Sequence, residues 1–221
     1  MDSAIDPLKT RSLPGHLWEK FPENWQLLDK SFQNYFESSI NRNQFPWKEL
    51  QWLTENSLGI SILGSFLLIF FLASHKNESR EFWEKRKKRN SSLLVILFLM
   101  GLGLSDLIAM RLKILFGRLK PHVDFYHPDY LPALSLPSNH AFNSSFLLAL
   151  MIGLKKTNST PIQSFFYIFV FFCILIVGFS RVLFGQHYPL DVFTGWLLGS
   201  ILGSLYSKLI KVLLFNKSIR T

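Results

Sequence analysis

The chain has 221 residues, is 48% hydrophobic and 15% aromatic, and carries a net charge of +9. Its length is that of one domain, and its apolar residues fall into long uncharged runs, which excludes an ordinary soluble core. The basic residues lie beside these runs, so an anionic lipid surface explains the charge better than nucleic acid does. With a single cysteine, Cys173, an internal disulfide is excluded.

Residues 1–57 contain no apolar stretch long enough for a cleavable signal peptide. The segment WQLLDKSFQNYFESSI repeats apolar residues at helical spacing, which predicts an amphipathic helix. The tryptophans suit a membrane–water interface, where the ring is buried and the N–H is hydrated. These are Trp18, Trp25, Trp47 and Trp52. We therefore expect interfacial helices, with a helical cap packed on the membrane domain as the alternative.

Five apolar runs then predict transmembrane helices. They cover approximately 58–74, 91–112, 140–154, 162–179 and 190–210. Several are shorter than the roughly 20 residues of an upright span, so their boundaries are loose. The expected fold is an all-α polytopic bundle of about five spans. Its membrane domain is predicted at 58–212, and a basic cytoplasmic tail at 213–221.

Three basic regions predict the orientation: residues 85–89, Lys155 with Lys156, and the lysines from Lys208 onward. By the positive-inside rule these regions are cytoplasmic. The loops at 111–139 and 180–190 then lie on the opposite face, together with all three polar clusters described below.

The last run carries three glycines at four-residue spacing, Gly195, Gly199 and Gly203. Such a stripe of small residues lets helices approach closely. We expect it to pack within one bundle, with a dimer interface as the alternative; the sequence leaves the oligomeric state open.

The first polar cluster lies at residues 111–122. Lys113 and Lys120 are seven residues apart, so on a continuous helix they share a face, whereas Arg118 lies elsewhere on the circle. Pro121 suggests the end of that helix. The two lysines could clamp a phosphate, or they could be flanking charges that extend to the lipid headgroups.

The second cluster is LPSNHAFNSS, residues 136–145. Ser138 or Asn139 could cap the helix that follows, and the N–H groups of a helix start favour an anion. His140 at that point could donate a proton to a departing oxygen. A capped helix start with an incidental histidine is the alternative.

The third cluster is SRVLFGQHYPLD, which contains Arg181, His187 and Asp191. The planar guanidinium of arginine can donate two parallel hydrogen bonds to an oxyanion. A histidine with a nearby carboxylate can be held in one tautomer and act as nucleophile or proton carrier. Pro189 suits the first turn of the last helix, which would place Asp191 close to His187. Because such groups are expensive near a membrane, the cluster indicates phosphoryl chemistry, with a buried structural His–Asp pair as the alternative.

In this order the clusters resemble the type 2 phosphatidic acid phosphatase (PAP2) superfamily of membrane lipid phosphatases. The family pattern is Lys, six residues, Arg-Pro; then Pro-Ser-Gly-His; then Ser-Arg, five residues, His, three residues, Asp. The chain matches the third motif fully but has Lys120 in place of the arginine and Asn139 in place of the glycine. Lysine keeps the charge and loses the bidentate geometry, whereas asparagine keeps the backbone N–H and narrows the pocket.

The resemblance implies that His187 attacks phosphorus to form a phosphohistidine and that Asp191 orients its imidazole. It implies that His140 protonates the leaving oxygen and later activates water. The phosphate oxygens would be held by Lys113, Lys120, Ser138, Arg181 and the backbone N–H of Asn139. No cofactor or metal is expected, because the chain supplies the cations and shows no metal-ligand spacing.

The expected function is therefore hydrolysis of a lipid phosphomonoester or diphosphate in the bacterial inner membrane, with the site facing the periplasm. Undecaprenyl diphosphate is the first choice by family analogy. Lipid A and phosphatidic acid or phosphatidylglycerol phosphate are alternatives. A non-catalytic lipid-phosphate binder would account for Lys120 and Asn139. The five apolar runs argue against the soluble vanadium haloperoxidase branch of the superfamily.

Overall fold

A computed structural model describes residues 16–38, 80–121, 133–154 and 161–215. These residues form helices joined by loops, with one isolated bridge between Leu119 and Leu134. The helices are η1 (Leu17–Lys20), α1 (Glu23–Ser38), α4 (Arg80–Phe116), α6 (Asn139–Leu154), α7 (Pro161–Leu183) and α8 (Pro189–Phe215). The predicted all-α fold is confirmed. The expected first span, 58–74, lies outside the described residues, as do Trp47, Trp52 and the tail from residue 216.

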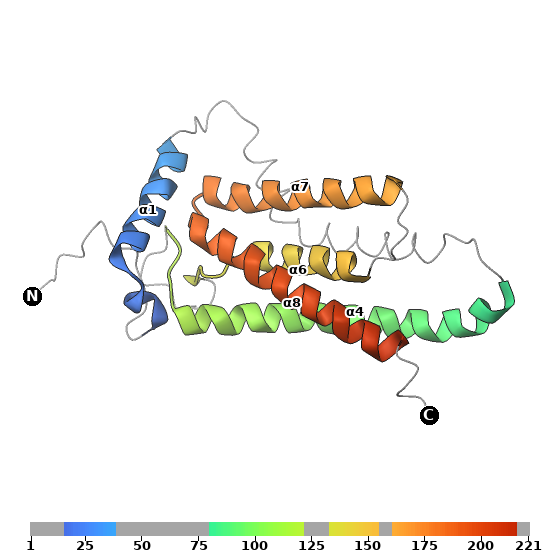
Figure 1. Ribbon diagram of the computed structural model, residues 1–221. Coiled ribbons are helices and arrows are strands. Elements are labelled where there is room, and N and C mark those ends of the chain that lie inside the picture. The colour runs from blue at the N-terminus through green and yellow to red at the C-terminus, as the bar shows by residue number, and fades with distance from the viewer. Residues whose placement is uncertain (1–15, 39–79, 122–132, 155–160, 216–221) are drawn as a thin grey trace, which may run out of the picture.

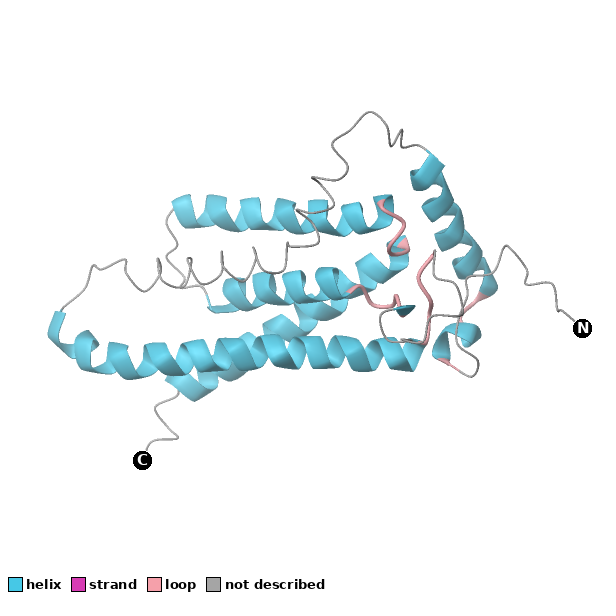
Figure 2. Cartoon of the chain, turned by 180° about the vertical axis from the view of Figure 1, so that it is seen from behind, coloured by secondary structure: helices cyan, strands magenta, loops and turns pink. Residues whose placement is uncertain are grey.

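Each of the four remaining predicted spans lies within one helix, namely α4, α6, α7 or α8. Among the described residues, Ser164–Leu183 and Pro189–Leu213 are long and apolar enough to cross a membrane. In Figure 1 the axes of α4, α6 and α7 are nearly parallel, with the chain direction of α6 opposite to that of α4 and α7, and α8 crosses them. Figure 2 shows from behind that α4 runs along the whole length of this bundle.

Helix α6 forms the centre of the bundle, in contact with α4, α7 and α8. Its closest neighbour is α8, whose glycines face it. A Cβ atom at Gly199 would lie 2.1 Å from the carbonyl oxygen of Phe142, and one at Gly203 would lie 2.3 Å from that of Phe146. Both distances are below van der Waals contact, so only glycine allows this approach. The expected packing of the stripe within one bundle is confirmed.

The opposite face of α8 exposes large apolar side chains at every fourth position. These are Phe193, Leu197, Ile201, Leu205 and Leu209. One helix therefore presents a glycine face to the bundle and an apolar face outward, the pattern of a helix that contacts lipid.

Helix α1 lies across one end of the bundle and contacts α7 and α8 (Figure 1). Its inner face is polar: the Gln33 amide donates to the Val182 carbonyl at 2.9 Å. Its outer face exposes Trp25, Leu28, Phe32 and Tyr35. The helix thus has one face suited to each of the two alternatives, a cap on the bundle and an interfacial surface. The interfacial assignment was wrong for Trp18, which is fully buried in the protein.

Candidate active site

The first polar cluster begins where α4 ends. Gly117 has φ +63° and donates its N–H to the Lys113 carbonyl at 2.8 Å, a glycine helix cap. The chain then runs alongside residues 133–135, and the Lys120 N–H donates to the Ala133 carbonyl at 2.9 Å. The expected continuous helix through Lys113 and Lys120 was therefore wrong, because α4 ends at Phe116 and Gly117, three positions before Lys120, has a positive φ. The buried Lys113 ammonium donates to the Leu134 carbonyl at 2.7 Å, which ties α4 to this segment.

The second cluster joins the start of α6 to the start of α8. The Ser138 N–H donates to the Asp191 carbonyl at 2.9 Å, so the second and third motifs are in direct contact. Ser138 is fully buried, yet its hydroxyl has no hydrogen-bond partner among the described residues. The side-chain oxygen of Asn139 is also without one in that part of the chain. Buried polar atoms are costly when unpaired. The Ser138 hydroxyl can donate to an anionic ligand at this helix start, whereas the Asn139 oxygen can only accept a hydrogen bond.

The third cluster is a tight turn between α7 and α8. Gly185 has φ +66°, and the N–H groups of Gln186 and His187 donate to the Arg181 carbonyl at 3.0 and 3.2 Å. The Arg181 guanidinium donates to the Gln186 side chain at 2.5 Å. The turn thereby brings the arginine and the histidine of the motif together.

His187 is almost completely buried, and its Nδ1 faces Asp191 Oδ2 at 3.5 Å. This distance is long for a hydrogen bond. Burial lowers the pKa of His187 to about 4; Asp191 opposes the shift, and Lys113 and Lys120 add to it. At neutral pH the imidazole is therefore uncharged. With a carboxylate beside Nδ1, the proton belongs on that nitrogen, and Nε2 keeps its lone pair.

Two lysines act on this imidazole, and Arg181 acts on one of them. Burial lowers the pKa of Lys120, and the nearby Arg181 lowers it further, against the opposing effect of Asp191. Lys113 and Lys120 both act on His187. Like charges held together repel each other, and an anion between them relieves this repulsion. The site is thus electrostatically suited to a phosphate.

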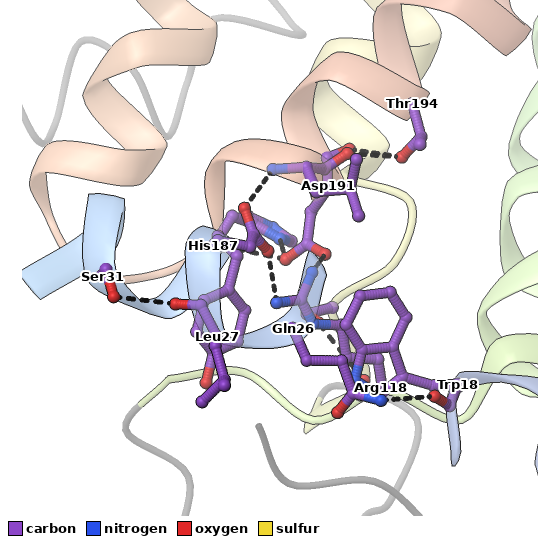
Figure 3. Close-up of polar contacts among 12 residues, drawn as sticks. Trp18, Gln26, Leu27, Ser31, Arg118, His187, Asp191 and Thr194 are labelled. Atoms are coloured by element: carbon purple, nitrogen blue, oxygen red, sulfur yellow. Dashed lines mark hydrogen bonds and ion pairs between the residues drawn. The ribbon is translucent and has the colours of Figure 1, made fainter. Parts of the chain in front are cut away.

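Asp191 uses both carboxylate oxygens. Oδ1 accepts a hydrogen bond from Arg118 Nη1 at 2.7 Å, and Oδ2 accepts one from the Tyr188 N–H at 2.9 Å (Figure 3). Arg118 is fully buried. Sequence reasoning set it aside because it assumed a continuous helix. The neighbouring Gly117 was the signal that could have revealed its inward position.

Arg118 is enclosed on its other sides by the N-terminal segment and by the turn between α7 and α8. Its Nη2 contacts Asp29 Oδ2 at 2.5 Å, and the rings of Trp18 and Tyr188 lie 4.0 and 3.8 Å from its central carbon. Asp29 Oδ1 accepts the Leu190 N–H at 2.8 Å. Burial raises the pKa of Asp29, and Arg118 opposes this shift. Sequence reasoning missed Asp29 entirely.

Two polar residues lie beside this centre. His140 is in the first turn of α6 and is partly exposed, as expected of a group that reaches substrate. Asp106 accepts a hydrogen bond from Asn143 at 3.3 Å, which joins α4 to α6. The described residues contain no group of three metal-ligating side chains that could hold an ion.

Comparison with known proteins settles the family. The model of the PAP2 superfamily matches residues 92–213, more than half of the chain. The chain belongs to the PAP2 superfamily. The match contains all three polar clusters and confirms the resemblance inferred from them. It leaves α1, and with it Asp29, outside.

Two relatives extend this result. An undecaprenyl-diphosphatase from Sulfolobus acidocaldarius is 31% identical over 116 residues, which cover 52% of this chain and 53% of that protein. The chain thus matches about half the length of this relative. The structure of a transmembrane PAP2-type phosphatidylglycerolphosphate phosphatase from Bacillus subtilis aligns with a TM-score of 0.54 and 24% identity, covering 86% of this chain and 88% of that one. The PAP2 protein described here is therefore a membrane protein with the all-helical fold of these phosphatases.

Proposed function

We propose that this PAP2 protein hydrolyses a phosphomonoester or diphosphate of a membrane lipid through a phosphohistidine on His187. The observation that carries the proposal is a buried, neutral imidazole with Nδ1 turned to a carboxylate, close to two lysines, one of which lies near Arg181. The phosphatase class is that of the family.

The reaction has two steps. His187 Nε2 attacks phosphorus, the bond from phosphorus to the leaving oxygen breaks, and His140 protonates that oxygen. His140 then takes a proton from water, the water oxygen attacks the phosphohistidine, and phosphate leaves with the imidazole restored. Asp191 stabilises the positive charge that develops on the ring.

The remaining residues hold the transferring group. Phosphoryl transfer depends mainly on positioning and on neutralising oxygen charge, which Lys113, Lys120 and Arg181 supply. The Ser138 hydroxyl, which has no hydrogen-bond partner within the described part of the chain, and the Asn139 N–H at the start of α6 complete the cradle. Because the cations come from the chain, EDTA should leave the rate unchanged, and loss of activity on chelation would contradict this mechanism.

Undecaprenyl diphosphate is the first substrate choice, on the strength of the relative that carries this activity. Lipid A, phosphatidic acid and phosphatidylglycerol phosphate are the alternatives. The basic segment at 85–89 and the tail favour a site that faces the periplasm across a bacterial inner membrane.

The test is phosphate release by detergent-purified protein from each of these four lipids. Wild type should release phosphate from at least one, and His187→Ala should abolish release. Lys208→Ala, an exposed lysine of α8 outside the site, is the matched control and should keep the wild-type rate. Equal release by the His187 variant would overturn the mechanism, and lipid binding without turnover would favour the non-catalytic binder.

A further inference from the structure

The contacts around Asp191 form a closed ring that includes the N-terminal helix. Arg118 binds Asp191 with one nitrogen and Asp29 with the other, at 2.7 and 2.5 Å. Asp29 then returns to α8 through the Leu190 N–H at 2.8 Å, next to Asp191 in the chain. One guanidinium and two carboxylates therefore fix the first turn of α8 from two sides.

The ring determines where the carboxylate of Asp191 points. With Oδ1 held by Arg118 and the Tyr188 N–H on Oδ2, the side chain cannot rotate without breaking a buried hydrogen bond. In this orientation Oδ2 is the carboxylate oxygen that faces Nδ1 of His187. Because the arginine fork is planar and rigid, its angle depends on its second partner, Asp29.

The guanidinium is also held in its plane. The rings of Trp18 and Tyr188 lie 4.0 and 3.8 Å from its central carbon. Trp18 comes from η1 and Asp29 from α1, so both belong to the segment outside the family match. Figure 3 shows Trp18, Arg118 and Asp191 in this succession, from the N-terminal segment to α8.

We propose that Asp29 and Arg118 are positioning residues, which hold Asp191 in the orientation that keeps the proton of His187 on Nδ1 and Nε2 ready to attack. This inference rests on the proposed function. It makes the N-terminal helix a part of the active site through its contact with Arg118. Outer partners that orient metal-binding histidines in a comparable way change activity by about 10- to 100-fold when they are mutated.

The experiment compares Asp29→Asn with Gln33→Met in the full chain. Both residues lie on the inner face of α1, but Gln33 binds the Val182 carbonyl of α7 and not Arg118. We expect Asp29→Asn to lower kcat by about 10- to 100-fold with KM unchanged, and Gln33→Met to lower only the unfolding temperature. If Asp29→Asn lowers the unfolding temperature but keeps the wild-type kcat, its role is merely structural and the proposal is overturned.

A second variant covers the case in which Asp29→Asn does not fold. Arg118→Lys keeps the buried charge but can bind only one carboxylate at a time, so kcat should fall and KM should stay the same. A wild-type kcat in this variant would overturn the proposal. If both single variants fold, kcat of the double variant should be no lower than kcat of the more impaired single variant, because both residues act through the carboxylate of Asp191. If the fold-losses in kcat of the two single variants multiply in the double variant, the two residues do not act through one carboxylate and the proposal is overturned.

A readout without turnover separates this inference from the proposed function. The ¹⁵N resonances of the His187 ring, assigned by their loss in His187→Gln, should show the Nδ1–H tautomer in wild type and a mixture in Asp29→Asn. An unchanged tautomer would overturn the positioning role. Failure of wild type to release phosphate from any lipid would instead overturn the proposed function and leave this measurement valid.

Discussion

Two contacts hold the amino end of α8, and they differ in kind. On one side α8 packs against α6 through glycines, with Gly195 placed so that a Cβ would lie 2.9 Å from the Ser138 carbonyl. On the other side α8 meets α1 and the end of α4 through a buried arginine and two carboxylates. The first contact brings backbones together, and the second fixes the direction of a side chain.

The energetics of the two contacts also differ. Close helix packing through small residues gains dispersion energy and involves no charge. A buried ionic group has a large desolvation cost that its partners offset only when the geometry is good. The glycine contact therefore suits stability, whereas the ionic contact suits orientation. The family match contains the whole of the first contact and only the Arg118 and Asp191 side of the second.

The largest expected effect comes from removing the shared cation. Arg118→Ala removes the cation that binds the buried carboxylates of both Asp29 and Asp191, which should lower the free energy of unfolding by about 3–5 kcal/mol. Arg111→Ala, an exposed arginine of α4 outside the ionic contact, is the matched control. Thermal unfolding in detergent measures the stability of both variants. Equal losses of stability would show that the ionic contact stabilises the fold no more than an exposed arginine does.

The glycine contact should be the next most sensitive. Gly199→Ala places a methyl group against the Phe142 carbonyl and the Ser145 hydroxyl, so it should cost about 1–3 kcal/mol of stability. Gly103→Ala meets no atom within 4 Å and should be neutral or stabilise the helix by up to about 1 kcal/mol. If the two alanines behave alike in thermal unfolding, the packing of α8 on α6 is looser than described.

Local patterns in the sequence predicted the glycine contact and the helices well. Apolar runs gave α4, α6, α7 and α8 their approximate positions, and the four-residue spacing of glycines placed their face of α8 against the bundle. The three motifs were also recognisable, because each one is short and contiguous. Helical periodicity and fixed spacing carry this information within a few turns.

The ionic contact could not be predicted in the same way. Asp29 and Leu190 are 161 residues apart, so no periodic pattern links them. Trp18 was assigned to the membrane interface because its type is common there, whereas it lies under Arg118. The inward turn of Arg118 depends on the backbone of Gly117, and a continuous helix would have turned it elsewhere.

Acid should lower the stability of the folded protein, because His187 is buried as a neutral imidazole. The pKa of His187 is about 4 in the folded protein and ordinarily 6.5, so the unfolded chain takes up the proton first as the pH falls. The stability is complete above pH 6.5 and declines between 6.5 and 4, by up to about 2 kcal/mol at pH 5. Unfolding temperatures at pH 7.5 and 5 measure this decline. His187→Gln should flatten it, and an equal decline in the variant would contradict the buried neutral imidazole.

The smallest effect should come from Lys120, two residues from Arg118 but outside both contacts. Lys120→Arg restores the family residue and its bidentate fork, so it should lower KM for the lipid phosphate by up to about fivefold, the equivalent of roughly 1 kcal/mol from one added hydrogen bond. Stability should not change, because Lys120 is only partly buried.

Lys113→Arg is the matched control. The Lys113 ammonium is already buried against the Leu134 carbonyl, so the larger guanidinium should lower stability and should not lower KM. A lower KM in both variants would mean that the delocalised charge of an arginine improves binding at either position, so that residue 120 has no special place in phosphate binding. No change in either would place Lys120 outside the phosphate cradle.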